Sequence, residues 1–247
     1  VKIFSKLNTR DLNMKKSELG EFVSSTTFEN ELDKKNFEKY FEIVPKMGRH
    51  WNIHSLLFLK RQSLSRILFL NEIYQQIVDV PGYIFEFGVQ WGTTLNILMQ
   101  LRGIYEPYNY SRKIIGFDTF LGFVDVEKID GDTSSVGDYR TYKGYETDLS
   151  QILSLQESMS PINHIKKFEL VKGDVVETLP SWFDKNREAV VSLAFFDMDL
   201  YKPTKSALTH VLERCVKGSI LVFDEFCCDK FPGETVAVFE TLDRQRL

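Results

Sequence analysis

VVSLAFFDMDLYKPTKSALTHVLERCVKGSILVFDE, residues 190–225, has the pattern of a strand, a helix and a second strand. The apolar runs Val190–Phe196 and Ser219–Phe223 have the length and composition of buried parallel strands. Between them, Tyr201–Lys217 has the periodicity of an amphipathic helix, which Gly218 would end. The apolar face of this helix carries Ala207, Leu208, Val211, Leu212 and Cys215. Because strand–helix–strand units are right-handed, both strands should end at the same edge of a parallel sheet.

Acidic residues directly follow both of these strands. Asp197 and Asp199 come after the first, and Asp224 and Glu225 come after the second. Ligands of open α/β sheets bind at the carboxyl edge, where we expect these side chains to converge. Like charges held close together repel unless a cation or a proton lies among them. The pattern therefore predicts a site for a hard divalent cation, most simply Mg²⁺, with solvated loop acids as the alternative.

Strands and helices alternate along the chain from Tyr83 onward. The expected elements are a strand in YIFEFG (83–88), a helix over Thr94–Arg102, strands over Lys113–Phe117 and Phe168–Val171, and a short helix around Thr178–Phe183. Together with the unit at 190–225, this alternation predicts a doubly wound α/β sheet. We assign this domain to residues 81–247.

Residues 1–80 lack this alternation and are predicted to form an N-terminal helical extension. Phe28–Ile43 has near-helical spacing of its apolar residues. Ile53–Val78 should form one helix or two, ended by Pro81–Gly82, and its apolar side chains would cover the sheet or form a homodimer face.

A histidine pair lies between these two segments. His50 and His54 are four residues apart, so on a helix they can share a face and hold a metal. A buried or hydrogen-bonded pair beside Trp51 is the alternative, which we favour.

The composition argues against several classes of protein. The chain has 247 residues, of which 43% are hydrophobic, and no apolar run approaches the roughly 20 residues of a membrane span. A net charge of -4 gives no basic surface for nucleic acid. The three cysteines, two of them adjacent, have neither metal-finger nor disulfide-framework spacing, which indicates reduced thiols and a cytoplasmic protein.

A long polar segment interrupts the alternation at 124–144. Its sequence, VDVEKIDGDTSSVGDYRTYKG, is rich in Asp, Gly and Ser. A loop of this length in a compact domain is usually functional or disordered. Because it leaves the carboxyl end of the second strand, we expect either a lid over the site or a simple surface insertion.

The turn after the first strand has the features of a nucleotide site. FEFGVQWGTT, residues 85–94, places Gly88 and Gly92 around a turn that opens a helix. Small residues there let the backbone approach a ligand, and the helix N-terminus presents free N–H groups. The spacing is not the G-x-G-x-x-G of a dinucleotide site. Glu86 lies two residues before Gly88, where its carboxylate would suit a cationic ligand such as a sulfonium.

Two further strand ends carry polar residues. Asp118 ends the second strand, where an acid commonly accepts hydrogen bonds from ribose hydroxyls. Gly173–Asp174 ends the third strand, where a flat base would fit. Each residue alone has a bland alternative, a turn or a helix cap. The succession of such residues at five strand ends favours a site.

The sequence resembles the class I S-adenosylmethionine (SAM)-dependent methyltransferases, and within them the macrocin O-methyltransferase (TylF) family of metal-dependent sugar O-methyltransferases. The resemblance covers about Arg61–Leu242, through FEFGVQWGTT, GFDTFLGF, KGDVVETLP, FDMDLYKPTKSAL, GSILVFDEF and PGETVAV. It implies a mostly parallel Rossmann-like sheet and a cytoplasmic homodimer. It also implies SAM and Mg²⁺ as cofactors and a small-molecule or glycan acceptor. The sugar would belong to a surface polysaccharide precursor or a natural-product glycoside.

The resemblance also implies roles for individual residues. SAM would be bound by Glu86, Gly88, Gly92, Thr93, Asp118, Gly173, Asp174 and Asp197. The metal would be bound by Asp197, Asp224 and Glu225, and Asp199 resembles the family's general base. Apart from the resemblance, Lys202 is a weaker alternative base, for which we favour the role of a solvated charge at the start of the helix. Many relatives have Asp-Asp in place of Asp224–Glu225 and Asp-Gly-Asp in place of Asp197–Asp199. The family's last two strands, a hairpin after PGETVAV, have no counterpart here, so either the chain is a fragment or the far edge of the sheet differs.

Three other functions share this fold class. A nicotinamide-dependent oxidoreductase is disfavoured by the glycine spacing. An accessory protein of a hydroxylase, which keeps the SAM and metal sites, and a non-catalytic SAM-binding protein remain open alternatives, because fold does not fix reaction.

Overall fold

The computed structural model describes residues 2–5, 15–16, 22–23 and 27–242. The chain divides into two compact units. One contains residues 1–8 and 70–247, and the other contains residues 9–69. We describe each unit by itself.

The larger unit is built on a six-stranded sheet in which every pairing is parallel. The strands are β1 (Lys2–Ser5), β4 (Tyr83–Phe87), β5 (Ile114–Asp118), β6 (Phe168–Lys172), β7 (Val191–Phe196) and β8 (Cys215–Phe223). Their order across the sheet is β1-β8-β7-β4-β5-β6, so the winding reverses between β4 and β7. The doubly wound α/β fold is confirmed, and the reversal is the point where such sheets bind ligands.

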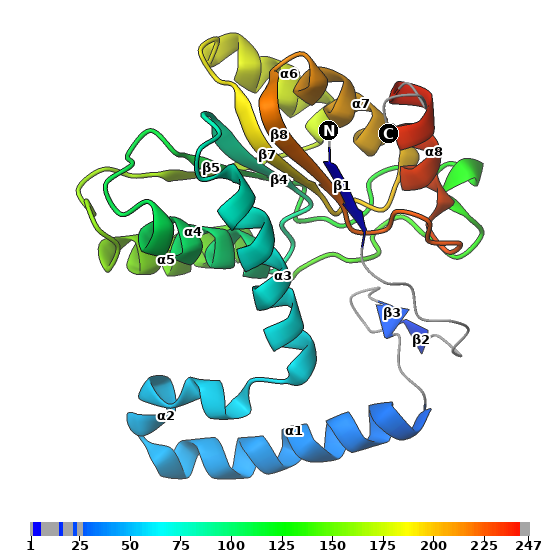
Figure 1. Ribbon diagram of the computed structural model, residues 1–247. Coiled ribbons are helices and arrows are strands. Elements are labelled where there is room, and N and C mark those ends of the chain that lie inside the picture. The colour runs from blue at the N-terminus through cyan, green and yellow to red at the C-terminus, as the bar shows by residue number, and fades with distance from the viewer. Residues whose placement is uncertain (1, 6–14, 17–21, 24–26, 243–247) are drawn as a thin grey trace. The chain divides into compact units, whose positions relative to one another are not determined.

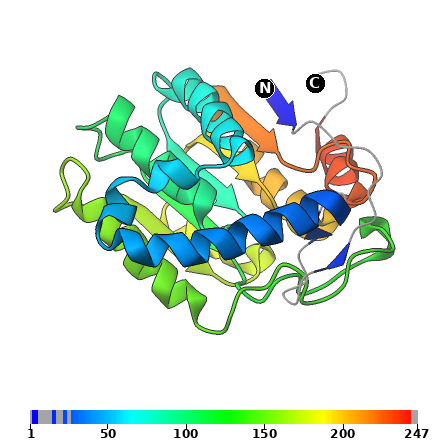
Figure 2. The ribbon, with the colours of Figure 1, turned by 90° about the horizontal axis from the view of Figure 1, so that it is seen from below.

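Helices cover both faces of this sheet (Figure 1). One face carries α6 (Val175–Lys185), α7 (Tyr201–Leu212) and α8 (Pro232–Thr241). The opposite face carries α4 (Thr93–Tyr105) and α5 (Tyr145–Ser158), which lie side by side in both views (Figure 2). Because both faces are covered, the central strand β7 is buried at every position rather than at alternate ones.

Aromatic side chains fill the core between the sheet and helices α6–α8. Phe85 packs edge-on against Trp182 of α6, with ring centroids 5.4 Å apart. Phe196 and Phe223, on neighbouring strands, stack with centroids 4.8 Å apart. These rings are almost fully buried and hold the strand ends in register below the carboxyl edge.

The helix predicted over Tyr201–Lys217 is longer than the one in the structure. It ends at Leu212, and Cys215 lies in β8 rather than on the helix face. The reason is strand pairing, because the backbone N–H of Val191 donates to the carbonyl of Arg214 at 2.9 Å. Gly218 does not end the helix but lies inside β8 with a φ of +96°.

The smaller unit contains β2 (Lys15–Lys16) and β3 (Phe22–Val23), which pair antiparallel. Its helices are α1 (Thr27–Met47), α2 (His50–Ile53), the 3-10 turn η1 (Ser55–Phe58) and the first part of α3 (Arg61–Ile77). The helix predicted at 28–43 is confirmed as α1. The stretch 53–78 contains the last residue of α2, the 3-10 turn η1 and the helix α3.

The histidine pair lies at the two ends of α2, with His50 as its first residue and His54 as its C-cap. The rings of His50 and His54 stack with centroids 6.4 Å apart, and both residues are exposed. The favoured prediction was a buried or hydrogen-bonded pair, and burial is wrong, since the short helix buries none of its residues. Within the described residues, no helix is both long enough and apolar enough to span a membrane.

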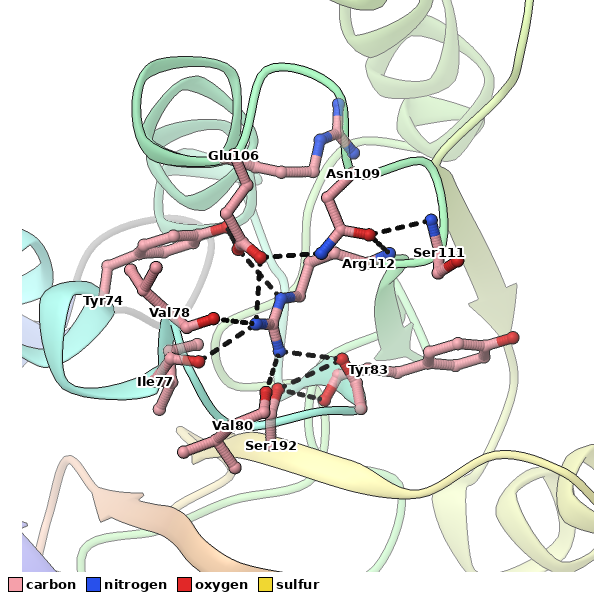
Figure 3. A network of polar contacts seen from close by, with 12 residues as sticks. Tyr74, Ile77, Val78, Val80, Tyr83, Glu106, Asn109, Ser111, Arg112 and Ser192 are labelled. Atoms are coloured by element: carbon pink, nitrogen blue, oxygen red, sulfur yellow. Dashed lines mark hydrogen bonds and ion pairs between the residues drawn. The ribbon is translucent and has the colours of Figure 1, made fainter.

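A buried arginine fastens the edge of the sheet opposite the carboxyl ends (Figure 3). The Arg112 guanidinium forms a two-pronged ion pair with Glu106, at 2.9 and 3.0 Å. Its remaining N–H groups donate to the carbonyls of Ile77, Val78, Val80 and Gly82 at 2.7–3.2 Å. Arg112 thus joins the end of α3 to the start of β4 and β5.

Candidate active site at the carboxyl edge of the sheet

The ends of β4, β7 and β8 are joined by backbone hydrogen bonds that continue past the strands. The N–H of Asp197 donates to the carbonyl of Phe87 at 2.8 Å. The N–H of Asp224 donates to the carbonyl of Phe196 at 3.0 Å. The first acid after β7 and the first acid after β8 therefore start from adjacent positions, and Asp197 lies beside the end of β4, where the glycine turn begins.

Gly88 is required by the packing of these strand ends. It has a φ of +88°, and a Cβ built on it would lie 1.9 Å from the carbonyl oxygen of Asp197. Gly92 has a φ of +74°, and a Cβ there would lie 2.5 Å from Cδ1 of Leu149 on α5. The sequence argument assigned both glycines to close approach of a ligand. The structure shows a protein neighbour at each position, which is a sufficient reason for glycine.

A Gly88→Ala substitution should therefore separate the ends of β4 and β7. A methyl group cannot stay 1.9 Å from a carbonyl oxygen, and the positive φ adds strain. We expect loss of SAM binding together with a lower midpoint of urea unfolding. The matched control is Gly144→Ala, since Gly144 has the same φ of +88° but nothing within 4 Å of a built Cβ. Equal effects of the two substitutions would contradict the packing argument.

Asp118 ties the end of β5 to the glycine turn. One carboxylate oxygen accepts the N–H of Gln90 at 2.8 Å, and the other accepts the N–H of Phe120 at 2.5 Å. Burial raises the pKa of Asp118, while these backbone hydrogen bonds oppose the rise. Each oxygen retains a second lone pair, so the carboxylate can still accept hydroxyl groups.

The end of β6 and the start of α4 supply three more of the predicted residues. Asp174 is the N-cap of α6, with its side chain accepting the N–H of Val176 at 2.9 Å. Gly173, at a φ of +136°, donates its N–H to the carbonyl of Asp118 at 2.9 Å. Thr93 is the first residue of α4 and is exposed. Asp174 therefore has a structural role as a helix cap. Its role in cofactor binding stays a prediction.

The acids after β7 and β8 lie close together, but they do not form a ready metal site. Asp199 is nearly buried, at 7% exposure, and has a φ of +63°, which Asp tolerates better than most residues. Asp197, Asp224 and Glu225 follow the adjacent strand ends. Over residues 27–242, no three His, Cys, Asp or Glu side chains are arranged to hold a metal ion. Metal ligation by these acids stays a prediction.

Glu234 is a site residue that the sequence argument missed. It lies in the first turn of α8, is fully buried, and accepts the N–H of Glu225 through Oε1 at 2.9 Å. Burial raises the pKa of Glu234 well above its usual value, and the charges of Asp199, Asp197 and Glu225 raise it further. A signal for it was present, since Glu234 is spaced three and four residues before buried Ala237 and Val238.

The loop 124–144 is anchored to the same edge through Asp130, a second residue that was missed. This buried carboxylate accepts the N–H of Tyr201, the first residue of α7, at 2.6 Å. It also accepts the N–H of Glu127 at 2.8 Å, which closes the 3-10 turn η2 (Lys128–Asp130). The loop therefore contacts the helix that begins two residues after Asp199.

A surface ion pair and a side-chain contact add to this anchoring. Nζ of Lys202 donates to Asp125 at 2.9 Å, which raises the pKa of the Lys202 amine. A raised pKa keeps that amine protonated, so Lys202 is poorly suited to act as a base. On the other side, Nε2 of Gln90 in the glycine turn donates to the carbonyl of Tyr139 at 3.4 Å.

The larger unit has the architecture of a class I methyltransferase. Its doubly wound parallel sheet carries a glycine turn after the central strand β4 and acids after β7 and β8. Comparison with known proteins identifies the family. The sequence matches the macrocin O-methyltransferase (TylF) family over residues 13–244. The chain belongs to this family and is an O-methyltransferase.

Solved structures agree with this assignment. The structure of CalS11, a calicheamicin methyltransferase, is 38% identical, has a TM-score of 0.84, and the match covers 96% of this chain and 91% of CalS11. The apo structure of CalS11, described as a TDP-rhamnose 3'-O-methyltransferase in calicheamicin biosynthesis, is 36% identical with a TM-score of 0.77, over 89% and 87% of the two chains. The O-methyltransferase NovP, 20% identical with a TM-score of 0.51 over 71% and 69%, supports the fold alone. The comparison with curated proteins gives no match.

Proposed function

We propose that this protein transfers a methyl group from SAM to a hydroxyl of a sugar, in a nucleotide-linked precursor or a natural-product glycoside. The observation that carries the proposal is that the glycine turn after β4 lies beside the acid that follows β7, at the reversal of the sheet, with the acid that follows β8 next to the end of β7. The likeness to CalS11, whose printed description names TDP-rhamnose as the methylated sugar, supports a sugar acceptor. The homodimer and the cytoplasmic location stay predictions.

Bound SAM would supply a methyl group that is already electrophilic. The chain's task is then to bind it, place the acceptor oxygen in line and remove a proton. Glu86, almost fully buried at the end of β4, would attract the cationic end of SAM. Asp118 would accept the ribose hydroxyls beside the backbone N–H groups that it already holds. The other assigned cofactor contacts are Gly88, Gly92, Thr93, Gly173, Asp174 and Asp197.

The acids at the edge are of the chemical type that a hard divalent cation prefers, although their side chains, all within the described residues, are not arranged to hold one. Asp197, Asp224 and Glu225 offer carboxylate oxygens, and the second oxygen of nearby Glu234 is buried without a hydrogen-bond partner. Asp197, Asp224 and Glu225 are the residues that would hold Mg²⁺. When bound, the cation would lower the pKa of the acceptor hydroxyl and fix its position.

Asp199 would accept the proton from the acceptor hydroxyl. It lies two residues beyond Asp197, and the pair is close enough to Glu234 for both charges to act on it. A general base must lie within hydrogen-bond reach of the proton that it accepts.

Titration calorimetry with SAM, S-adenosylhomocysteine and NAD⁺, followed by a methyl-transfer assay on TDP-deoxysugars with and without EDTA, tests the proposal. We expect SAM and S-adenosylhomocysteine to bind and NAD⁺ not to bind. Transfer should stop in EDTA and resume with excess Mg²⁺, and Asp224→Asn should raise the Mg²⁺ concentration required. Transfer that is indifferent to EDTA would remove the metal from the proposal. SAM binding without transfer to any acceptor would favour the accessory or non-catalytic alternatives.

A further inference from the structure

Asp199, the proposed general base, lies at the centre of a tight turn. The N–H of Leu200 donates to the carbonyl of Met198 at 2.7 Å, which closes a three-residue turn around Asp199. Asp199 has a φ of +63°, and a positive φ at the centre of such a turn marks its rare and strained form. A strained backbone persists only where the surrounding structure holds it in place. The turn therefore needs support on both sides.

The sheet supports the turn on the side of β7. The N–H of Asp197 donates to the carbonyl of Phe87 at 2.8 Å, so the residue two positions before Asp199 is fixed at the strand end. On the other side the chain enters α7, with Leu200 as the N-cap. A leucine side chain has no acceptor, so Leu200 cannot cap the helix itself. Support on this side comes from another part of the chain.

Asp130, on the long polar loop, supplies the cap that Leu200 cannot. Its Oδ1 accepts the N–H of Tyr201, the first residue of α7, at 2.6 Å. Its Oδ2 accepts the N–H of Glu127 at 2.8 Å, which holds the carboxylate within its own loop. Asp130 is only 1% exposed, so water does not compete for these bonds. A carboxylate at a helix N-terminus is also favoured by the helix dipole.

A glycine in α8 makes room for this contact. A Cβ built on Gly233 would lie 2.2 Å from Oδ1 of Asp130 and 2.7 Å from the backbone nitrogen of Tyr201. Gly233 is buried in the first turn of α8. Glycine is a poor helix former, and its presence here is explained by the two groups that it admits. The cap is therefore built from three segments: the loop, the start of α7 and the start of α8.

We propose that Asp130 is a positioning residue for methyl transfer, which acts through Asp199. By holding the N–H of Tyr201, Asp130 fixes the start of α7 and so keeps the strained turn and its carboxylate in place to accept the proton. The inference rests on the proposed function, in which Asp199 is the general base. It gives the loop 124–144 a role in the site that a simple surface insertion would not have.

The test is a double-mutant cycle, measured by single-turnover methyl transfer from SAM to a TDP-deoxysugar. Asp130→Ala should lower the transfer rate by about 10²-fold, the effect of misplacing a catalytic group by about 1 Å. The dissociation constant of SAM, measured by calorimetry, should be unchanged. In the Asp199→Asn background the same substitution should have almost no further effect, because the group that it positions is already absent. Equal falls in the two backgrounds would show a merely structural role and overturn the inference.

The matched control is Asp125→Ala. Asp125 lies on the same loop and also reaches the first turn of α7, but it does so on the surface, by accepting from Nζ of Lys202 at 2.9 Å. It does not hold the backbone of the helix. The control should therefore transfer methyl groups like the parent protein. An equal loss of rate in Asp125→Ala would assign the effect to loop anchoring in general and overturn the role of Asp130.

Asp130→Asn serves if Asp130→Ala fails to fold. Asn keeps one acceptor oxygen for the N–H of Tyr201 and places an amide donor against the N–H of Glu127. We expect a smaller fall in rate, again absent in the Asp199→Asn background, and equal falls in both backgrounds would overturn the inference here too. Calorimetry with S-adenosylhomocysteine shows whether each variant keeps its folded cofactor site.

Amide hydrogen exchange separates failure of this inference from failure of the proposed function. Without the cap, the amides of residues 198–204 should exchange faster, whereas Asp125→Ala should leave them as in the parent protein. Unchanged exchange in Asp130→Ala overturns the inference whatever the parent protein methylates. A parent protein that binds SAM but methylates no sugar overturns the proposed function and the catalytic part of this inference. Faster exchange in Asp130→Ala would then still support its hold on the turn.

Discussion

Replacing Asp199 by Asn is expected to lower the turnover number by about 10²–10⁴-fold, the usual contribution of a general base. Asn is nearly the same size and tolerates the φ of +63° at this position, so the backbone should be preserved. The dissociation constant of SAM should change little, because the proposed role of Asp199 concerns the acceptor proton. Single-turnover methyl transfer, with SAM binding measured by calorimetry on the same preparation, checks both expectations.

The matched control for this substitution is Asp184→Asn, on the exposed side of α6 and away from the carboxyl edge. It should leave both turnover and SAM affinity unchanged. Unchanged turnover in Asp199→Asn would remove Asp199 from the base role. Loss of SAM binding would instead place it among the cofactor contacts.

Replacing Arg112 by Met should lower the free energy of unfolding by about 3–5 kcal/mol, the range for breaking a buried ion pair by removing one partner. The substitution leaves the Glu106 carboxylate, 7% exposed, without its cation. It also removes the N–H donors to four main-chain carbonyls. Urea unfolding followed by circular dichroism measures the change. Arg187→Met, at an exposed position, should change stability by less than about 0.5 kcal/mol.

The same ion pair predicts a pH dependence with a definite sign. Burial by itself raises the pKa of Glu106, but hydrogen bonds from Arg112, Tyr74 and Asn109 outweigh it and lower the pKa from its ordinary value. A lowered pKa in the folded state stabilises the protein above the unfolded-state pKa, and this stability is lost as the pH falls through the folded value. The parent protein should therefore lose stability below about pH 4.5 more steeply than Arg112→Met. Parallel acid curves for the two proteins would contradict this account.

The central strands could be predicted from the sequence because each one is marked by residues within the strand itself and directly after it. Each central strand is a short apolar run ended by Gly or an acid, so Val191–Phe196 was predicted within one residue. The end of α7 was misplaced because Arg214 and Cys215 continue the helical periodicity, while their backbone pairs with β7. The pairing of β1 with β8 was not predicted, since four residues at the start of the chain carry no signal for a partner more than two hundred residues away.

The candidate site was predicted only in part, because some of its residues are marked by their neighbours in the sequence and others are not. Acids at strand ends are visible in the sequence, and the structure places those after β7 and β8 side by side. Glu234 and Asp130 were missed because their partners, the N–H groups of Glu225 and Tyr201, become neighbours only through tertiary packing. The packing reason for Gly88 was missed likewise, because its neighbour is the carbonyl of Asp197 on a distant strand.

The central pairing of the sheet has a consequence for folding kinetics. Tyr83 of β4 pairs with Val191 of β7, more than one hundred residues later, and every contact of Gly88 with Asp197 spans a similar separation. Closing so long a loop costs chain entropy before the contact repays it, which makes such pairings slow. During synthesis, β4 and β5 can pair as soon as Asp118 has emerged, but β4 keeps one unpaired edge until β7 follows. The glycine turn therefore acquires its final shape late, in the same event that completes the centre of the sheet.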